Sequence, residues 1–260
     1  MIECTSPIVQ LLHGKNQSES VLESPDMAYR KTSTRQLYLA SNSPRRRELL
    51  ALCGWDYDLL PAQVNEDPLP DEDGVDYVQR LAKNKAYAAA NQCDTAGVII
   101  AADTTVVDRQ PDGKSILLGK PRDNGEAREM LSNLRGHFHQ VHTAIVVLSK
   151  FDGRMISDLC TTHVPMRNYT DAEIDAYVAS GDAMDKAGAY AIQHIGFHPV
   201  EKMAGCFANV MGLPLCHLVR SLFKLELIPP VDVPQACQQA LDYHCPVYPQ
   251  ILKEINPDHT

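Results

Sequence analysis

A serine- and arginine-rich run near the start of the chain has the residue types of an anion-binding turn. Residues 41–47 read SNSPRRR, and Ser43 followed by Pro44 is a typical helix start. The free N–H groups and the positive dipole end of a helix start bind anions. Cations in a first helical turn are otherwise unfavourable. Arg45 and Arg46 at this place therefore indicate a phosphate site, with a solvated basic turn as the alternative.

An aspartate interrupts an otherwise apolar stretch in the middle of the chain. Residues 97–107 read GVIIAADTTVV, which is typical of a buried central strand. A carboxylate inside such a strand must be paired, hydrogen-bonded or metal-bound, because its burial is otherwise costly. Asp103 could hold a divalent cation or take a proton from water. The alternative is that it begins a loop.

Other polar residues carry less information by themselves. Glu66 and the helix residue Lys85 are unremarkable in isolation, and Lys120 lies on a turn with the sequence LGKP. In residues 185–193, DKAGAYAIQ, small side chains let two backbones approach, and Gln193 is expected to end a strand. These residues gain meaning only if the fold brings them to Asp103.

Metal ligation by histidine or cysteine is a weaker interpretation. His139 and His142 fall on opposite faces of a predicted strand, so they and His137 are better explained as polar strand residues. The eight cysteines contain no C-x-x-C pair, which disfavours a structural zinc site. Cys206 and Cys216 are expected to be core thiols.

Alternating strands and helices must position these residues. Periodicity and capping signals predict strands at 36–40, 57–60, 97–107, 139–149 and 155–164, the last two forming a hairpin around 152–153. They predict helices at 43–54, 75–91, 124–134, 170–179 and 213–225, the fourth of which begins with a capping box. Elements mixed in this order indicate an α/β domain with a central sheet.

Composition excludes several classes of protein. The chain has 260 residues, and 33 acidic against 24 basic side chains give a net charge of −9. Such a surface disfavours a duplex nucleic-acid partner but leaves small polyanions open. No apolar run is long enough to span a bilayer, so no membrane partner is expected. The cytoplasm is the expected location, with the thiols reduced.

The two ends of the chain differ from its middle. Residues 1–34 are polar and aperiodic, and we expect a flexible N-terminal extension. Residues 35–228 carry the alternating elements and form the predicted domain. Residues 229–260 hold six of the 17 prolines and form a C-terminal extension, for which docking and disorder are both open.

The order of these motifs resembles the Maf family of nucleoside triphosphate pyrophosphatases. The matching stretches are LYLASNSPRRRELL at 37–50, LAKNKA at 81–86, AADTTVV at 101–107, LGKPRD at 118–123 and the segment 169–215. The resemblance covers about residues 36–226. It implies an inosine-triphosphatase-like (Maf/Ham1) fold, an elongated mixed sheet flanked by helices, with a deep cleft between two lobes.

The resemblance also implies a reaction and roles for individual residues. The family hydrolyses a nucleoside triphosphate to the monophosphate and pyrophosphate with a divalent cation, Mg²⁺ or Mn²⁺. The proton acceptor of its A-D-T motif corresponds to Asp103. Positions similar to those of the family's phosphate and cleft residues are Ser41, Arg45, Arg46, Glu66, Lys85 and Lys120. Asp103 and Glu66 are the expected metal ligands, and whether Asp103 acts as base, ligand or both stays open.

Three positions bear on the substrate. The family branch that prefers dTTP and UTP is similar to this chain at Arg45, Thr104 and Gln193, whereas a branch acting on 7-methyl-GTP has a different residue at each. A glutamine amide both donates and accepts, so it can pair with the O4 and N3–H edge of uracil or thymine. A strand-end glutamine without such a role is the alternative for Gln193.

Two kinds of function follow from these observations. The leading hypothesis is a metal-dependent dTTP/UTP pyrophosphatase, which acts on normal or modified pyrimidine nucleotides. The alternative is a non-catalytic nucleotide-binding regulator of cell division, although a pure sensor need not retain a water-activating acid such as Asp103. A 7-methyl-GTP-type pyrophosphatase is a further alternative, and the resemblance makes a homodimer plausible.

Overall fold

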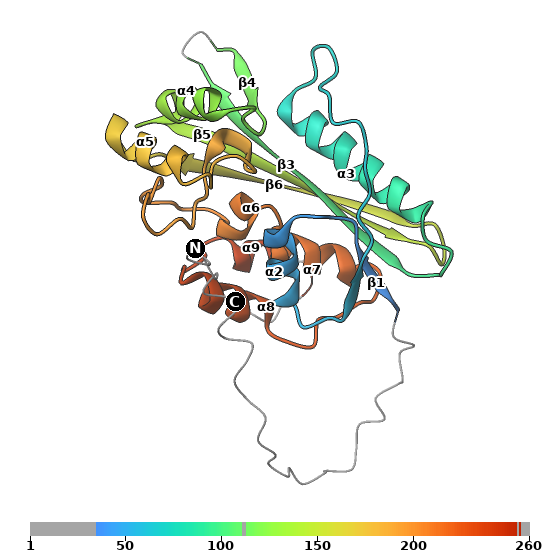
Figure 1. Ribbon diagram of the computed structural model, residues 1–260. Coiled ribbons are helices and arrows are strands. Elements are labelled where there is room, and N and C mark those ends of the chain that lie inside the picture. The colour runs from blue at the N-terminus through green and yellow to red at the C-terminus, as the bar shows by residue number, and fades with distance from the viewer. Residues whose placement is uncertain (1–34, 111–112, 254, 256–260) are drawn as a thin grey trace.

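A computed structural model describes residues 35–110, 113–253 and 255 of the chain (Figure 1). The N-terminal extension predicted for residues 1–34 lies outside the described residues. Within them, one mixed sheet has the strand order β2-β1-β3-β5-β6, with β4 paired to β3. The strands are β1 (Leu37–Leu39), β2 (Tyr57–Leu59), β3 (Val98–Arg109), β4 (Ser115–Leu118), β5 (Phe138–Ser149) and β6 (Met155–Pro165). The prediction of an α/β fold with a mixed sheet is confirmed.

Strand β3 is the centre of the sheet and has two different edges. On one edge it pairs antiparallel with β5 over residues 98–107. On the other edge β1 pairs in parallel with residues 98–100, and β4 pairs antiparallel with residues 106–109. Over the part of the chain that the structure describes, no strand pairs with this edge between them, at 101–105. Asp103 lies in the middle of this open stretch, within the strand, so the interpretation as a loop start is wrong.

Local sequence explains where the helices begin. The side chain of Ser43 accepts a hydrogen bond from the N–H of Arg46, and Pro44 occupies the first helical position of α2. Thr170 and Glu173 form the predicted capping box. The helices are α2 (Pro44–Ala51), α3 (Gly74–Ala90), α4 (Asn124–Leu134), α5 (Asp171–Ala179), the short 3₁₀ helix η1 (Ala187–Ala189), α6 (Phe207–Met211), α7 (Leu215–Phe223), α8 (Val233–Leu241) and α9 (Tyr248–Leu252).

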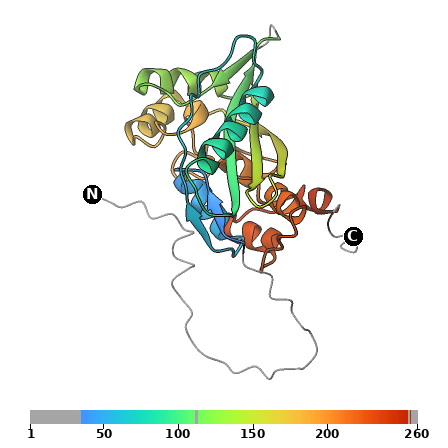
Figure 2. The same ribbon diagram turned by 90° about the vertical axis from the view of Figure 1, so that its right-hand side faces the viewer.

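The two faces of the sheet are covered by different helices. Ile99 and Ala101 of β3 pack with the apolar face of α3, which lies along the long strands (Figures 1 and 2). Ile100 and Ala102 point to the opposite face because side chains alternate along a strand, and they pack with residues of α2 and α7. Farther along this second face, Val106 packs with residues of α4 and α5. Thr104 therefore lies between two separate apolar clusters.

The C-terminal extension docks on the domain over its described part. Helices α8 and α9 lie at the end of the sheet opposite α4 and α5 (Figure 1). Val233 of α8 is buried in the same apolar cluster as Leu218 and Leu222 of α7, and Leu241 and Leu252 pack against that cluster. The sequence left open whether this extension docks or is disordered. The packing of its apolar side chains against the core cluster shows that it docks. Helix α7 is accordingly not the last helix of the chain.

No helix among the described residues is both long and apolar enough to cross a bilayer.

Candidate active site

A cavity of about 570 Å³ opens at the unpaired edge of β3. Its walls come from the turn before α2, from β3, from the turn after β4, and from the segments around residues 185–193 and 210–212. All the site residues predicted from the sequence line it, namely Ser41, Arg45, Arg46, Glu66, Lys85, Asp103, Thr104, Lys120 and Gln193. The fold therefore brings together residues that lie far apart in the chain.

One lysine joins two carboxylates in this cavity. Lys85 Nζ lies 2.6 Å from Asp103 Oδ1 and 2.6 Å from Glu66 Oε1. Asp103 shares the α3 face of the strand with Ala101, which explains why a lysine of α3 reaches it. Burial raises the pKa of Asp103 above its ordinary value, although Lys85 and Arg46 oppose the shift. Burial would also raise the pKa of Glu66, but the hydrogen bond and charge of Lys85 outweigh it and lower that pKa.

Arg46 is held on the other side of the strand. Its Nε donates to the carbonyl of Gly212 at 2.8 Å, Nη2 to Thr104 Oγ1 at 3.0 Å, and Nη1 to Ser41 Oγ at 3.4 Å. Thr104 points away from Asp103 because adjacent strand residues face opposite sides. Burial lowers the pKa of the Arg46 guanidinium, and the charge of Asp103 opposes this shift. A partly buried guanidinium held by three hydrogen bonds suits recognition of a phosphate.

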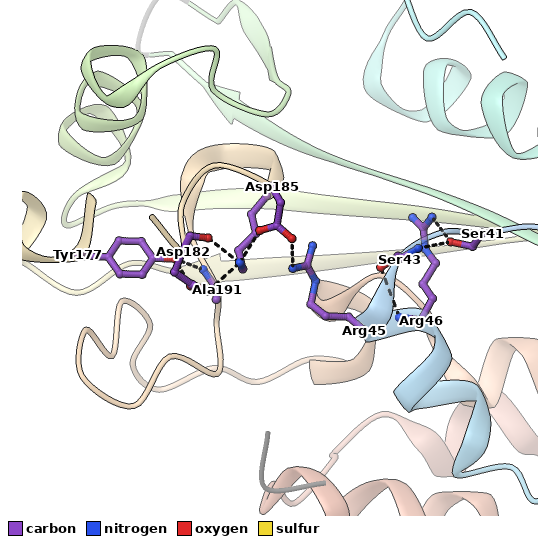
Figure 3. Close-up of polar contacts among 9 residues, drawn as sticks. Ser41, Ser43, Arg45, Arg46, Tyr177, Asp182, Asp185 and Ala191 are labelled. Carbon is purple, nitrogen blue, oxygen red and sulfur yellow. Dashed lines mark hydrogen bonds and ion pairs between the residues drawn. The ribbon is translucent and has the colours of Figure 1, made fainter. Parts of the chain in front are cut away.

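Arg45 forms an ion pair with Asp185, the first residue of the 185–193 segment, to which the sequence assigned no role. Its Nη1 lies 3.2 Å from Asp185 Oδ2, and Asp185 Oδ1 accepts from Lys186 Nζ at 2.6 Å (Figure 3). Lys186 is itself buried and also donates to Asp182 Oδ1 at 2.9 Å. The signal in the sequence that could have indicated this ion pair is an acidic residue next to a lysine in a segment of otherwise small side chains. Both Asp185 and Lys186 line the cavity.

Lys120 and Gln193 are the last two of the predicted residues that line the cavity. Lys120 is exposed and has no ion pair with any described residue. The N–H of Gly188 donates to the carbonyl of Gly119 at 3.0 Å, which holds the turn of Lys120 beside the segment of Gln193. Gln193 is exposed and lies in a turn, so the prediction that it ends a strand is wrong. Gly188 and Ala189, which precede Gln193 in the chain, both have positive φ angles.

The donor set of the cavity fits a hard divalent cation. Asp103 and Glu66 bind the same ammonium, so their carboxylates lie close enough to share one ion. Mg²⁺ is usually held by one or two carboxylates together with substrate phosphates and water. The described part of the chain contains no cluster of three or more histidine, cysteine, aspartate or glutamate side chains that could hold a metal. Substrate phosphate oxygens and water would therefore complete the coordination shell of a cation held here.

The histidines in and just before β5 make polar contacts with residues other than the two proposed metal ligands. His139 Nε2 lies 2.8 Å from the hydroxyl of Tyr190, and His142 Nδ1 lies 2.8 Å from Thr161 Oγ1. His137 Nε2 lies 3.0 Å from Asp108. Each contact joins neighbouring elements, as the interpretation as polar strand residues expects. Cys206 and Cys216 are buried free thiols.

Comparison with known proteins assigns the chain to a family. A model described as Maf-like protein matches residues 36–225, which include the whole cavity. The chain belongs to the Maf-like protein family. The resemblance seen in the sequence motifs is thereby confirmed. The match ends before α8 and α9, so these two docked helices are an addition of this Maf-like chain to the part that the family model describes.

Several relatives of this Maf-like chain carry the same descriptive name. A dTTP/UTP pyrophosphatase of Pasteurella multocida (strain Pm70) is 42% identical over 202 residues, which are 74% of this chain and 98% of the relative. A dTTP/UTP pyrophosphatase of Alkaliphilus metalliredigens (strain QYMF) is 42% identical over 73% of this chain and 95% of its own length. About a quarter of the Maf-like chain therefore lies outside these matches.

Solved structures are similar at a much lower level. The Ham1 protein of Staphylococcus aureus matches 52% of this Maf-like chain and 73% of its own chain, with a TM-score of 0.35 and 14% sequence identity. A HAM1 protein from Coxiella burnetii matches 52% of this chain and 74% of its own, with the same TM-score and identity.

Proposed function

We propose that the protein is a nucleoside triphosphate pyrophosphatase that hydrolyses dTTP and UTP to the monophosphate and pyrophosphate. The observation that carries the proposal is a buried carboxylate, Asp103, at the centre of a cavity ringed by Lys85, Arg45, Arg46 and Lys120. A basic cavity in an acidic protein suits a small polyanion. Membership of the Maf-like family and the names of its relatives support the same reaction.

The cations of the cavity are placed to bind and stabilise a triphosphate. When water attacks the α-phosphorus, negative charge accumulates on the departing pyrophosphate. Arg45 and Arg46 at the start of α2 and Lys120 on the turn after β4 can neutralise this charge, together with the dipole of the helix. In phosphoryl transfer, positioning and charge neutralisation of this kind supply most of the catalysis.

Asp103 is the proposed acceptor of the water proton. Lys85 binds Oδ1, and no hydrogen bond from another described residue occupies Oδ2, which is therefore free to orient a water. The raised pKa of Asp103 makes it a stronger base than an exposed aspartate. Mg²⁺ or Mn²⁺, bound by Asp103 and Glu66, would add positive charge beside the phosphates and acidify a bound water.

Gln193 is the residue proposed to recognise the nucleobase. Its side chain is exposed and lines the cavity, in the same segment of chain as Asp185 and Lys186. Donation and acceptance by one amide match the N3–H and O4 of uracil and thymine. A glutamate at this place could only accept, so Gln193→Glu should weaken the preference for these bases.

A triphosphate panel tests the proposal directly. Purified protein would be incubated with dTTP, UTP, CTP, GTP and 7-methyl-GTP, with Mg²⁺, with Mn²⁺ or with a chelator, while pyrophosphate and orthophosphate are measured separately. We expect pyrophosphate from dTTP and UTP, and loss of turnover with the chelator. Release of orthophosphate alone, or binding of UTP without turnover, would contradict the proposal, and the second result would favour a non-catalytic regulator.

Location and assembly are further expectations from the sequence. We infer a cytoplasmic enzyme, since the described cysteines are all free thiols. A homodimer stays a prediction, which light scattering on the purified protein would test.

A further inference from the structure

The turn that carries Gln193 is attached to helix α5 by one tyrosine. The hydroxyl of Tyr177 accepts a hydrogen bond from the backbone N–H of Ala191 at 2.9 Å, two residues before Gln193 (Figure 3). Tyr177 is 2% exposed and Ala191 is 7% exposed, so water cannot readily replace this bond. A buried N–H without a partner costs more than an ordinary hydrogen bond contributes. The backbone at Ala191 is therefore tied to Tyr177.

The ring of the same tyrosine packs against residues that follow Gln193 in the sequence. It stacks on Phe197 with a centroid distance of 4.4 Å and an interplanar angle of 9°. Its edge contacts His194 at 4.8 Å, and His194 Nδ1 accepts from the N–H of Phe197 at 2.9 Å. Tyr177 thus contacts the chain before and after Gln193, while Gln193 itself is exposed and lines the cavity.

A second hydrogen bond fixes the direction of the tyrosine hydroxyl. Tyr177 donates to Asp182 Oδ2 at 2.8 Å, so the hydroxyl lone pairs remain directed at Ala191. Asp182 in turn accepts from Lys186, which also binds Asp185, the ion-pair partner of Arg45 (Figure 3). The turn of Gln193 and the phosphate-binding turn are thereby linked by one continuous set of polar contacts.

We propose that Tyr177 is a positioning residue for base discrimination: its hydroxyl fixes the turn that presents Gln193 to the nucleobase. Tyr177 is not itself among the residues that line the cavity, so it acts through Gln193 and not by touching the substrate. The inference rests on the proposed reading of the base by Gln193. Loss of the Tyr177 hydroxyl removes only the first of these linked contacts and leaves those of Lys186, Asp185 and Arg45 in place. The inference therefore predicts an effect on the choice between bases and none on the binding of the phosphates.

Tyr177→Phe is the direct test because it removes the hydroxyl and keeps the stacked ring. We expect the ratio of kcat/KM for UTP to kcat/KM for GTP to fall by about fivefold, the effect of one hydrogen bond. The inhibition constant of pyrophosphate, which reports on the phosphate end alone, should stay within twofold of the wild type. An unchanged ratio would overturn the inference, and so would an equal loss for both substrates.

Tyr169→Phe is a matched control. Tyr169 is also buried, its hydroxyl donates to the backbone carbonyl of Leu131 at 2.7 Å, and its ring contacts Phe197 at 4.8 Å. It makes no hydrogen bond to the turn of Gln193. We expect it to lower stability and leave the substrate ratio unchanged. If both variants shift the ratio equally, the effect of Tyr177 is general destabilisation and the inference is wrong.

A double-mutant cycle separates this inference from the proposed function. If Tyr177 acts through Gln193, Tyr177→Phe should have no further effect on the ratio once Gln193→Ala is present. Additive effects would overturn the inference. If Gln193→Ala alone leaves the ratio unchanged, the proposed base reader is wrong and the inference falls with it. Should Tyr177→Phe fail to fold, Asp182→Ala frees the hydroxyl at a partly exposed position, and the same fall in the ratio is expected.

Discussion

At the scale of single residues, Asp103 experiences opposite electrostatic effects. Burial raises its pKa, whereas Lys85 and Arg46 lower it, and the net shift is upward. Glu66 binds the same lysine, but its net pKa shift is downward. Two neighbouring carboxylates whose pKa values move apart are typical of a division between a base and a permanently charged partner. Asp103 is the member suited to accept a proton.

Replacing Asp103 tests this assignment. Asp103→Asn should lower kcat by about 10³-fold, in the range of general-base contributions, while a non-hydrolysable triphosphate analogue still binds. Steady-state kinetics and calorimetry measure the two effects. The control is Asp108→Asn, since Asp108 is a buried carboxylate of the same strand outside the cavity. Turnover of Asp103→Asn at the wild-type rate would remove Asp103 from the role of base.

Asp185 competes with substrate for Arg45 in the ligand-free protein. Asp185→Asn should release the guanidinium and lower the inhibition constant of pyrophosphate by about two- to fivefold, as the loss of a partly exposed ion pair allows. Inhibition kinetics at constant ionic strength measure it. Asp171→Asn removes a comparable ion pair with Arg135 away from the cavity and should change nothing. Weaker inhibition after Asp185→Asn would contradict competition.

At the scale of elements, the site depends on an edge that two strands leave open. Because β1 ends beside residue 100 and β4 ends beside residue 106, the middle of β3 has room for the turn before α2 and the turn after β4. Alternation along β3 then sends Asp103 to α3 and Thr104 to α2. Strand β3 thus supplies Asp103 to the part of the site next to α3 and Thr104 to the part next to α2.

The docked helices offer a test at this scale. Val233→Ala should lower the free energy of unfolding by about 2 kcal/mol, because the valine of α8 is buried in the core cluster. Turnover should be unchanged at a temperature where the protein stays folded, since Val233 does not line the cavity. Val231→Ala, at a position that is 43% exposed, is the matched control for urea unfolding. Equal losses for both would argue against docking of α8.

At the scale of the whole molecule, a net charge of −9 and a basic cavity coexist. The acidic excess lies outside the cavity, whose wall brings together Arg45, Arg46, Lys85, Lys120 and Lys186. Net charge alone would have pointed away from a polyanionic substrate. The local field near the cavity, and not the total charge, decides which ligand is attracted.

Global stability should fall in mild acid, in part because His139 is buried. Burial lowers the pKa of His139 to about 3, so the unfolded chain binds a proton below its ordinary value of 6.5 and the folded protein does not. The free energy of unfolding should therefore decrease as pH falls from 6.5 towards 3, by up to about 1.4 kcal/mol per pH unit. Urea unfolding at pH 7 and pH 5 measures it. His139→Gln should flatten this dependence, whereas the exposed His163→Gln should not; equal slopes in all three proteins would contradict the prediction.

Local physics explains what the sequence by itself determined. Caps and side-chain alternation act over a few residues, so the start of α2 at Ser43, the capping box at Thr170, the alternating helices and strands, and the chemical types of the site residues were all predictable. The family resemblance added the roles of those residues, and the match over residues 36–225 supports the family.

Only the tertiary structure decided the long-range contacts. The ion pair of Arg45 with Asp185 joins residues 140 apart in the chain, and no local pattern encodes their distance. The same holds for the docking of α8, which depends on the apolar surface that α7 offers, and for the turn that brings Gln193 to the cavity. Burial of apolar area selects one arrangement of the elements, and that arrangement places the polar residues of the site together.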